Sequence, residues 1–356
     1  MKKVAIVGIQ GVPAKYGGFE TFVENIIGDN CSHDIHYTVF CAEKSYATRR
    51  KTYKGASLKY VPLFHANGPQ STLYDIFSML KCLTGYDAVL ILGVSGAIFL
   101  PVFRLLYRKR IIVNIDGLEY KRAKWGKFTK WFLRICTTMA VHCSDVLVSD
   151  NKGIQDYVKA TYHRSSFMIA YGGDHVKTNV SEERQRSILL KCNLTDGNYA
   201  ICISRIEPEN NVHLILETFA KTGKDLVFIG NWERSKYSRD LKEKYAPYPH
   251  IRMLSSIYDT DILYALRSHC DCYIHGHSAG GTNPSLVEAM HFGMPILAYD
   301  VVYNRETTEN SAYYFKSSEQ LAELLERKDK NGESMKAIAD SQYTWKRIAE
   351  QYESLY

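Results

Sequence analysis

Two successive series of apolar runs alternating with amphipathic segments strongly limit the folds available to this chain. The first series begins with the continuous apolar run at residues 4–9, and the second begins with a similar run at 199–206. Uninterrupted apolar strands of this kind are typical of parallel sheets that are covered by helices on both faces. We therefore predict an α/β protein with two similar halves, each built on a parallel sheet.

The spacing of apolar residues predicts the elements within each half. A helix is expected at 19–27, where apolar residues recur at i, i+3, i+4, i+7 and i+8, and others at 97–106 and 212–220. The further predicted strands are 37–41, 58–61, 89–92, 111–115 and 146–149 in the first half, and 226–229, 251–254, 272–274 and 295–299 in the second.

The domain boundary is expected where this pattern breaks. A chain of 356 residues is long for one hydrophobic core. The break at 172–180 predicts one domain over 1–176 and a second over 177–341. The last predicted helix lies within 342–356 and can pack on either half, including back on the N-terminal domain. Two such domains with facing loop edges would leave a ligand-binding cleft between them.

The most informative short segment for function is 275–290. An apolar run enters a loop of small residues, and the loop leads into a helix that Asn283 can cap and Pro284 can start. Backbone N–H groups at such a position can bind phosphate oxygens. Glu288 follows little more than one turn later, where it can bind a hydroxyl of the molecule that carries the phosphates. This pattern favours a nucleotide-sugar site, and the alternative is a capped core helix after a tight turn.

The positive charge of the chain is concentrated in one window. Residues 104–134 contain ten Lys and Arg but only Asp116 and Glu119 as acids, a formal charge of +8 against +7 for the whole chain. Aromatic residues alternate with these charges, which favours the surface of an anionic membrane. Nucleic acid is not expected, because no nucleic-acid-binding motif accompanies the window. The alternative is a solvated face whose aromatic rings point inward. The residues expected at the membrane are Lys121, Arg122, Lys124, Trp125, Lys127, Lys130 and Trp131.

Other features favour a cytoplasmic protein. The nine cysteines show no Cys-x-x-Cys pairing of a metal site and are typical of buried thiols in a reducing compartment. The apolar run at 4–9 is too short for a signal peptide, so we interpret it as the first strand. The first strand–helix turn, Gly8-Ile9-Gln10-Gly11-Val12-Pro13, lacks the Gly-x-Gly-x-x-Gly pattern of NAD-binding proteins. We therefore expect neither a cofactor nor a metal.

Four spaced motifs resemble a known enzyme family over nearly the whole chain. They are Gly11-Val12-Pro13-Ala14-Lys15-Tyr16-Gly17-Gly18-Phe19-Glu20-Thr21, Asp116-Gly117-Leu118-Glu119-Tyr120-Lys121-Arg122, Ser204-Arg205-Ile206-Glu207-Pro208-Glu209-Asn210-Asn211 and Gly281-Thr282-Asn283-Pro284-Ser285. The C-terminal half resembles the group 1 (family 4) glycosyltransferases. The motifs together resemble the bacterial rhamnosyltransferase branch, which builds surface polysaccharides such as capsule or O-antigen.

This resemblance implies a GT-B fold of two facing Rossmann-like domains. It also implies a retaining, metal-independent transfer of a sugar from a nucleotide donor, with dTDP-L-rhamnose as the donor that fits this branch. The acceptor would be a lipid-linked saccharide, and the enzyme would be a peripheral protein at the inner face of the plasma membrane.

Arg205 is the first candidate catalytic residue. Negative charge develops on the leaving phosphate, and a guanidinium that stays charged would stabilise it. The alternative role for Arg205 is an ion pair with Glu207 or Glu209. Many relatives have a lysine five or six positions later, where this chain has Asn210 and Asn211. We expect these two amides to contact the donor phosphates.

The loop amides of Gly281, Thr282 and Asn283 are expected to complete the phosphate site, and Glu288 to bind a ribose-type hydroxyl. Relatives have a second glutamate eight positions before the one that Glu288 matches, but this chain has Gly280 there. His277 is a candidate contact to the donor, with a packed core histidine as the alternative.

The N-terminal half is expected to supply acceptor-side residues. Asp116 follows a predicted strand and could bind the acceptor hydroxyl or help to move its proton. The alternative is that Asp116 caps the next turn with Gly117. Gly17 and Gly18 allow close approach to the donor, and Glu20 and Glu119 are expected to bind the acceptor.

Three other functions remain open at this point. A GT-B transferase could use a UDP- or GDP-linked sugar, because a few pocket contacts decide donor choice. A GT-B epimerase would act on the nucleotide sugar without an acceptor. A non-catalytic sugar-nucleotide-binding subunit would fit the glycine at 280 and the asparagines at 210 and 211.

Overall fold

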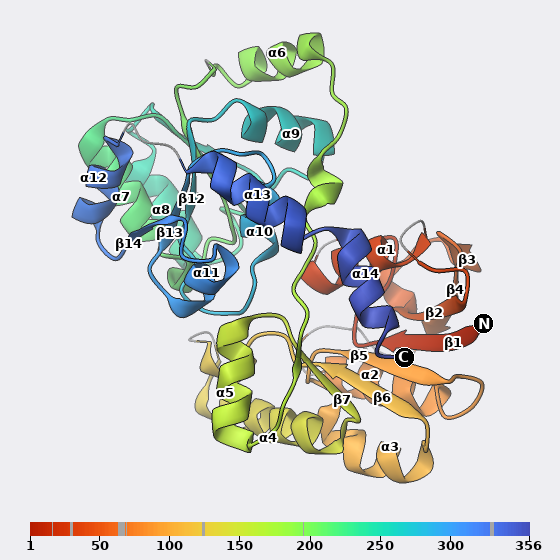
Figure 1. Ribbon diagram of the computed structural model, residues 1–356. Helices are drawn as coiled ribbons and strands as arrows, with labels where there is room; N and C mark the ends of the chain where they lie inside the picture. Colours follow the sequence, from red (N-terminus) through yellow and green to blue (C-terminus); the bar gives the residue numbers. More distant parts are fainter. Residues whose placement is uncertain are drawn as a thin grey trace. The chain divides into compact units, whose positions relative to one another are not determined.

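The chain folds into two compact α/β units (Figure 1). This computed structural model describes residues 1–15, 17–28, 31–62, 68, 70–122, 125–194, 196–327 and 331–356. Unit 1 contains residues 1–171 together with 345–356, and unit 2 contains residues 172–344. The chain therefore crosses from one unit to the other twice.

Unit 1 is built on an eight-stranded sheet with the order β3-β4-β2-β1-β5-β6-β7-β8. Neighbouring strands are parallel, except that β3 pairs with β4 in the antiparallel direction. The direction of strand addition reverses between β1 and β5. The strands are β1 (Lys2–Val7), β2 (Ile35–Ala42), β3 (Thr52–Tyr53), β4 (Ala56–Val61), β5 (Ala88–Leu92), β6 (Arg110–Asn114), β7 (Val146–Ser149) and β8 (Phe167–Met168).

The helices of unit 1 include one from the far end of the sequence. Helix α14 packs against α1, and its Tyr352 ring lies 4.8 Å from that of Phe22, centroid to centroid. Trp345, Tyr352 and Tyr356 are buried with the apolar residues of β1 and β2 in one hydrophobic core. The helices are α1 (Gly18–Ile26), α2 (Gln70–Lys81), α3 (Leu100–Leu106), α4 (Lys127–Cys143), α5 (Lys152–Tyr162) and α14 (Trp345–Glu353).

Unit 2 has a six-stranded sheet with the order β11-β10-β9-β12-β13-β14, in which every pair is parallel. The direction of strand addition reverses between β9 and β12. The strands are β9 (Ala200–Ile203), β10 (Leu226–Ile229), β11 (Ile251–Leu254), β12 (Cys272–His275), β13 (Ile296–Tyr299) and β14 (Tyr313–Phe315). The helices are α6 (Glu182–Lys191), α7 (Val212–Thr222), α8 (Lys236–Tyr245), α9 (Thr260–Ser268), α10 (Pro284–Met290), α11 (Val302–Thr307), α12 (Ser318–Leu325) and α13 (Gly332–Gln342).

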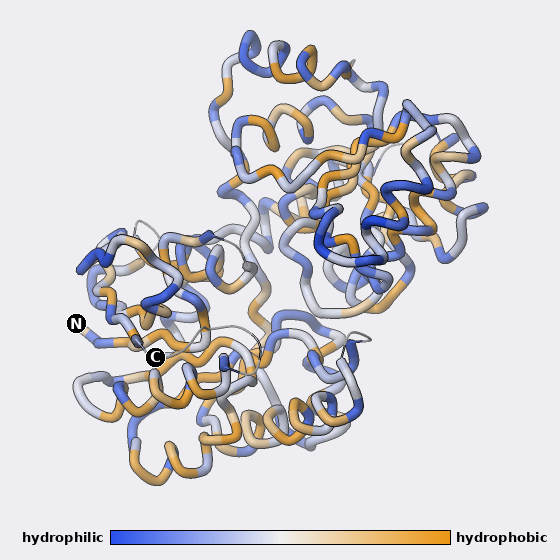
Figure 2. The backbone as a smooth tube through the Cα atoms, turned by 180° about the vertical axis from the view of Figure 1, so that it is seen from behind, coloured by the Kyte–Doolittle hydropathy of each residue, from blue (hydrophilic) through white to orange (hydrophobic). Residues whose placement is uncertain are grey.

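The predicted α/β class with parallel sheets is confirmed, and apolar strands run through the interior of each unit in Figure 2. The strand predicted at 199–206 is wrong beyond Ile203, where β9 ends. Ile206 nevertheless stays buried, because it packs from the following loop. The predicted helix at 97–106 begins as the 3-10 turn η3 (Ala97–Phe99) before α3. No helix among the described residues is long and apolar enough to cross a membrane.

Candidate functional site

Arg205 lies two residues beyond β9, at the carboxyl edge of the unit 2 sheet where strand addition reverses. In parallel α/β sheets ligands bind at this edge and at such a reversal. The Arg205 side chain is 33% exposed, and its Nη1 is 3.9 Å from Oε2 of Glu207. The expected alternative pairing is therefore present, but at a distance that leaves much of the guanidinium open to a ligand.

The two asparagines that follow Arg205 bind protein groups. Asn210 is 1% exposed, and its Nδ2 donates to the Arg205 carbonyl at 2.7 Å. Asn211 donates from Nδ2 to the Gly276 carbonyl at 2.8 Å. Each of these amides donates to a backbone carbonyl, and their contact with the donor phosphates stays a prediction. The Asn210 amide fixes the backbone of Arg205, and the Asn211 amide ties two loops together.

The loop after β9 and the loop after β12 approach each other very closely. A Cβ on Gly276 would lie 2.2 Å from the Asn210 carbonyl oxygen, so only glycine fits there. Ser278 donates from its backbone N and from Oγ to the Glu209 carbonyl, at 2.9 and 2.7 Å. These contacts hold the small-residue loop beside Arg205.

Helix α10 starts as the sequence predicts. Asn283 is its N-cap, accepting at Oδ1 from the backbone N of Ser285 at 3.0 Å, and Pro284 is its first residue. The preceding Thr282 is 4% exposed, whereas Gly281 is half-buried. Gly280 has φ of 131°, a conformation that L side chains rarely adopt. The glutamate that relatives have at this position would therefore be strained on this backbone.

Glu288 is held by a buried cation that the sequence analysis missed. Arg267 of α9 donates from Nη2 to Oε2 of Glu288, and the Arg267 side chain is only 2% exposed. His175 Nε2 lies 3.7 Å from the other oxygen, Oε1. Burial is the largest cause that lowers the pKa of His175, partly offset by the Glu288 carboxylate. Glu288 is 17% exposed, so a ligand hydroxyl can reach it only over a small area.

His277 packs on a second histidine at the end of β12. The rings of His275 and His277 are stacked, with centroids 4.6 Å apart and planes 10° apart. His275 is 1% exposed, and burial lowers its pKa to about 3, so its ring is neutral at physiological pH. His277 is 8% exposed, in agreement with the packed-histidine alternative.

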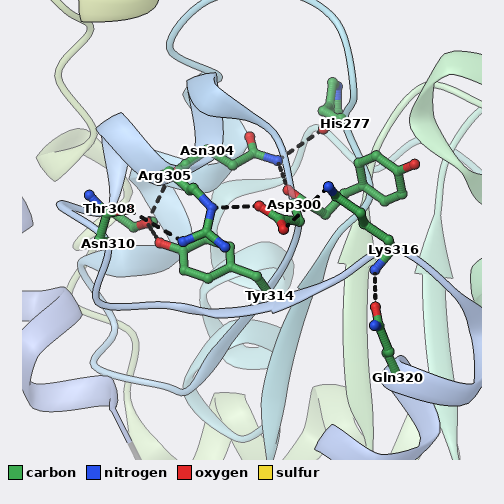
Figure 3. A network of polar contacts seen from close by, with 10 residues as sticks. His277, Asp300, Asn304, Arg305, Thr308, Asn310, Tyr314, Lys316 and Gln320 are labelled. Atoms are coloured by element: carbon green, nitrogen blue, oxygen red, sulfur yellow. Dashed lines mark hydrogen bonds and ion pairs between the residues drawn. The ribbon is translucent and has the colours of Figure 1, made fainter.

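A third loop, after β13, is fixed to the same edge (Figure 3). Asn304 of α11 is 2% exposed and donates from Nδ2 to the carbonyls of His277 and Tyr299, at 2.9 and 2.8 Å. The loops after β9, β12 and β13 are thus connected by the amide side chains of Asn211 and Asn304. This edge of unit 2 therefore carries the partly exposed Arg205 beside loops that are joined by hydrogen bonds.

In unit 1, Gly17 and Gly18 lie above a buried carboxylate. Glu20 is 9% exposed, and its Oε1 accepts from the backbone N of Gln10 at 2.9 Å. A Cβ on Gly17, whose φ is 125°, would lie 2.0 Å from Oε2 of Glu20. Burial raises the pKa of Glu20, and the bond from Gln10 partly opposes that rise. Glu20 therefore fixes the loop after β1 through its hydrogen bond with Gln10 and its close contact with Gly17.

Asp116 follows β6 by two residues and has a left-handed backbone with φ of 57°. Its backbone N donates to Oδ1 of Asn114 at 2.8 Å, which stabilises this conformation. The same edge carries Asp150, directly after β7, which is 1% exposed. Burial is the largest cause that raises the pKa of Tyr171, and the charges of Asp116 and Asp150 raise it further, so both carboxylates lie near this tyrosine.

Glu119 and Arg122 form a local pair. Arg122 Nε is 2.8 Å from Oε1 of Glu119, and Trp125 donates from Nε1 to Oε2 at 3.0 Å. The Arg122 side chain is only 12% exposed, so its expected place among solvated membrane-facing cations is not supported. The ammonium of Lys121 lies 3.8 Å from the centre of the Tyr157 ring. Lys124 lies outside the described residues.

The N-terminal part of α4 presents aromatic residues outward. Phe128 is 76% exposed and Trp131 is 58% exposed, with ring centroids 5.8 Å apart. These two rings do not point inward as the alternative expects, whereas Trp125 and Phe132 are partly buried. Lys127 is exposed beside it and Lys130 is partly exposed, so cations and aromatic rings share this segment.

Sequence reasoning missed Arg267, His175, Asn114 and Asp150. Asp150 and Asn114 lie at strand ends, where the carboxyl edge of a parallel sheet gathers polar groups, so that position was an available signal. Nothing local in the sequence marks Arg267 or His175, because their role depends on packing against α10. Among the described residues no group of three or more His, Cys, Asp or Glu is arranged to hold a metal ion.

Comparison with known proteins agrees with this architecture. Residues 190–345 match the family described as glycosyl transferases group 1, and residues 1–174 match a domain of unknown function, DUF1972. No curated protein matches the chain significantly.

Several solved structures share the fold at low sequence identity. Sucrose-phosphate synthase from Thermosynechococcus elongatus has a TM-score of 0.81 at 13% identity, covering 100% of this chain and 98% of that one. Anabaena Alr3699/HepE, in complex with UDP and glucose, has a TM-score of 0.76 at 14% identity, and the match covers 99% of each chain. The catalytic domain of starch synthase IV from Arabidopsis thaliana, bound to ADP and acarbose, has a TM-score of 0.72 at 14% identity. This match covers 100% of this chain and 98% of that one. The chain therefore has the GT-B fold, and residues 190–345 in its C-terminal unit are similar to the group 1 glycosyltransferases.

Proposed function

We propose that this protein is a retaining, metal-independent glycosyltransferase that uses a nucleotide-sugar donor. The observation that carries the proposal is the position of Arg205, partly exposed beyond β9 and beside the loop of small residues that leads to α10. Unit 2 would bind the donor, and unit 1 would supply acceptor-side residues.

Arg205 would stabilise the charge that develops on the leaving phosphate. Its backbone is fixed by Asn210, so the loop need not reorganise when the donor binds. The backbone amides at 281–283 would add donors without adding charge. Relatives have a lysine as well as this arginine, whereas this chain has Asn210 and Asn211 in place of the lysine. Arg205 would therefore stabilise a larger share of the phosphate charge than the arginine of those relatives does.

Glu288 would accept a hydrogen bond from a sugar hydroxyl of the nucleotide. The ion pair with Arg267 fixes the direction of the Glu288 side chain. His277 remains a proposed donor contact, although its stacking on His275 makes its packing role evident.

We propose dTDP-L-rhamnose as the donor. The support is the resemblance of the four motifs to the rhamnosyltransferase branch. UDP- and GDP-linked sugars are the alternatives, since Anabaena Alr3699/HepE binds UDP and glucose on the same fold. The discriminating measurement is thermal shift of the full chain with dTDP, UDP, GDP and ADP and their sugar conjugates. Selective stabilisation by dTDP and dTDP-L-rhamnose is expected. A preference for UDP or GDP would contradict the rhamnose donor and favour a UDP- or GDP-linked sugar.

The acceptor in this proposal is a lipid-linked saccharide of bacterial surface polysaccharide synthesis. Asp116 would contact it in unit 1, whereas Gly17 and Gly18 at the start of α1 would approach the donor. Glu20 would act mainly by shaping that loop, because it is buried. Glu119 would act through the segment that it holds with Arg122 and Trp125.

The exposed segment Lys127–Trp131 would bring the enzyme to an anionic membrane at the cytoplasmic face. Phe128 and Trp131 would enter the interface while Lys127 and Lys130 bind lipid phosphates. Replacing both aromatic residues by serine should weaken binding to phosphatidylglycerol vesicles. Lys127→Gln with Lys130→Gln should do the same, whereas Lys221→Gln with Lys242→Gln removes equal charge from unit 2 and should not. Equal effects of the two lysine pairs would reject this surface.

A non-catalytic sugar-nucleotide-binding subunit is the second candidate. It is favoured by Gly280, whose backbone would strain a glutamate, and by the occupied amides of Asn210 and Asn211. Incubation with radiolabelled donor, with and without lipid-linked saccharides, separates the candidates. A transferase needs both substrates for turnover, an epimerase needs only the donor, and a binding subunit turns over neither.

A further inference from the structure

The backbone at Asp116 requires support from its surroundings. Its φ of 57° lies in the left-handed region, which few residues other than glycine, asparagine and aspartate adopt. Such conformations persist where neighbouring groups hold them. Here the backbone N of Asp116 donates to Oδ1 of Asn114 at 2.8 Å, and this bond helps to hold the conformation.

The Asn114 amide is itself fixed by the C-terminal helix. Asn114 is the last residue of β6 and is 1% exposed. Its Nδ2 donates to the hydroxyl oxygen of Tyr352 at 2.7 Å. Because the N–H of Asp116 needs an acceptor, the amide oxygen must face Asp116 and the amide nitrogen must face Tyr352.

Tyr352 is suited to hold this amide in one orientation. It is 0% exposed, and its ring packs against Phe22 of α1. Burial raises the pKa of Tyr352 well above its ordinary value, so the hydroxyl stays protonated and neutral. A continuous chain of contacts therefore links α14 to the backbone of Asp116, all within unit 1.

We propose that Tyr352 and Asn114 are positioning residues that hold Asp116 in the conformation in which its carboxylate meets the acceptor. This inference rests on the acceptor-side role given to Asp116 in the proposed function. It assigns to the last helix of the chain a part in the reaction beyond closing the core of unit 1.

The test compares two buried tyrosine hydroxyls, each of which joins the C-terminal segment to a strand of unit 1. Tyr352→Phe removes the contact to Asn114. Tyr37→Phe is the matched control, because the Tyr37 hydroxyl donates to that of Tyr356 at 3.2 Å and so joins the C-terminal segment to β2 instead of β6. We expect Tyr352→Phe to lower kcat at least tenfold with an unchanged KM for the donor, and Tyr37→Phe to keep kcat within about twofold.

Two further measurements keep the inference open to refutation. Adding Tyr352→Phe to Asn114→Ala should lower kcat no further, because the first change has already removed the contact. Hydrogen exchange of the Asp116 amide should quicken in Tyr352→Phe and not in Tyr37→Phe. Exchange that is equal in the two variants, or equal losses of kcat, would overturn the positioning role. If the wild-type protein transfers no sugar, the proposed function fails, while hydrogen exchange still decides whether Tyr352 fixes Asp116.

Discussion

The two units use the carboxyl edges of their parallel sheets in opposite chemical ways. In unit 2 the edge presents the guanidinium of Arg205 and backbone N–H groups, with loops joined by the amides of Asn211 and Asn304. In unit 1 the corresponding edge gathers carboxylates, among them Asp116 and the buried Glu20 and Asp150. One architecture thus supports an edge with a partly exposed guanidinium and an edge with several carboxylates, so the loops and not the sheets decide the chemistry.

The two units should respond to pH with opposite signs. In unit 1, burial raises the pKa of Asp75 to about 7, although Ser95 and Gly96 donate to it. The folded state then holds a proton that the unfolded chain releases above its pKa of about 4, so stability falls as pH rises from 4 to 7. In unit 2, burial lowers the pKa of His275 to about 3. The unfolded chain then gains a proton below about 6.5 that the folded state does not, so stability falls as pH falls.

The largest expected effects follow from these two groups. Asp75→Asn should stabilise the protein by up to about 4 kcal/mol above pH 7 and by nothing near pH 4. His275→Phe, which keeps the ring against His277, should stabilise it near pH 4 and not above pH 7. Urea unfolding of the full chain across this range measures both. If the stability changes of the two variants depended on pH in the same direction, the contrast between the units would be wrong.

Arg205→Ala should lower kcat by about 100- to 1,000-fold, or roughly 3–4 kcal/mol, because the leaving phosphate loses its accessible cation. Arg252→Ala is the control, since Arg252 of β11 pairs with Asp225 in the same unit. Steady-state rates with saturating donor give the comparison. A normal rate for Arg205→Ala would show that the edge of unit 2 does not act on the leaving group.

Arg267→Met should destabilise unit 2 by about 3 kcal/mol, because Glu288 would be left without its buried partner. Glu288→Gln with Arg267→Met should recover part of that loss, since the uncompensated charge is then absent. Chemical unfolding measures the stability of each variant, and nucleotide affinity reports Glu288 directly. Additive losses in the double variant would mean that the two side chains act independently.

Changes at Asn211 should have the smallest effect. Asn211→Gly keeps the left-handed backbone, which has φ of 51°, and loses only the bond to Gly276, at a cost of about 1 kcal/mol. Asn211→Ala should cost about 1 kcal/mol more, because alanine also strains the backbone. The difference between the two variants in unfolding experiments isolates the amide contact from the conformation. Equal stabilities of the wild type and Asn211→Gly would show that the hydrogen bond from Asn211 to Gly276 does not stabilise unit 2.

The strands could be predicted because a doubly covered parallel strand is apolar along its length, as in Leu226–Ile229, where β10 has the predicted bounds. Ile206 shows the limit of this signal, since a buried loop residue extended the apparent strand past Ile203. The short strands β3, β8 and β14 were not predicted, because two or three residues carry no periodicity.

The side-chain partners could be predicted far less well. The position of Arg205 after a strand follows from the pattern, and so does the capping of α10 by Asn283. The partners of Asn211 and Glu288 do not, because Gly276 and Arg267 come close to them only through packing. Likewise, charge counting could not distinguish the paired Arg122 from the exposed Lys127.

The return of residues 345–356 to unit 1 has a consequence for how the protein is made. The core that β1 and β2 share with Trp345, Tyr352 and Tyr356 is incomplete until residues 345–356 have been synthesised. On the ribosome, the whole of unit 2 is therefore translated before unit 1 can close. Unit 2, a continuous stretch of chain, can reach its final fold first, which reverses the usual order in which domains mature during translation.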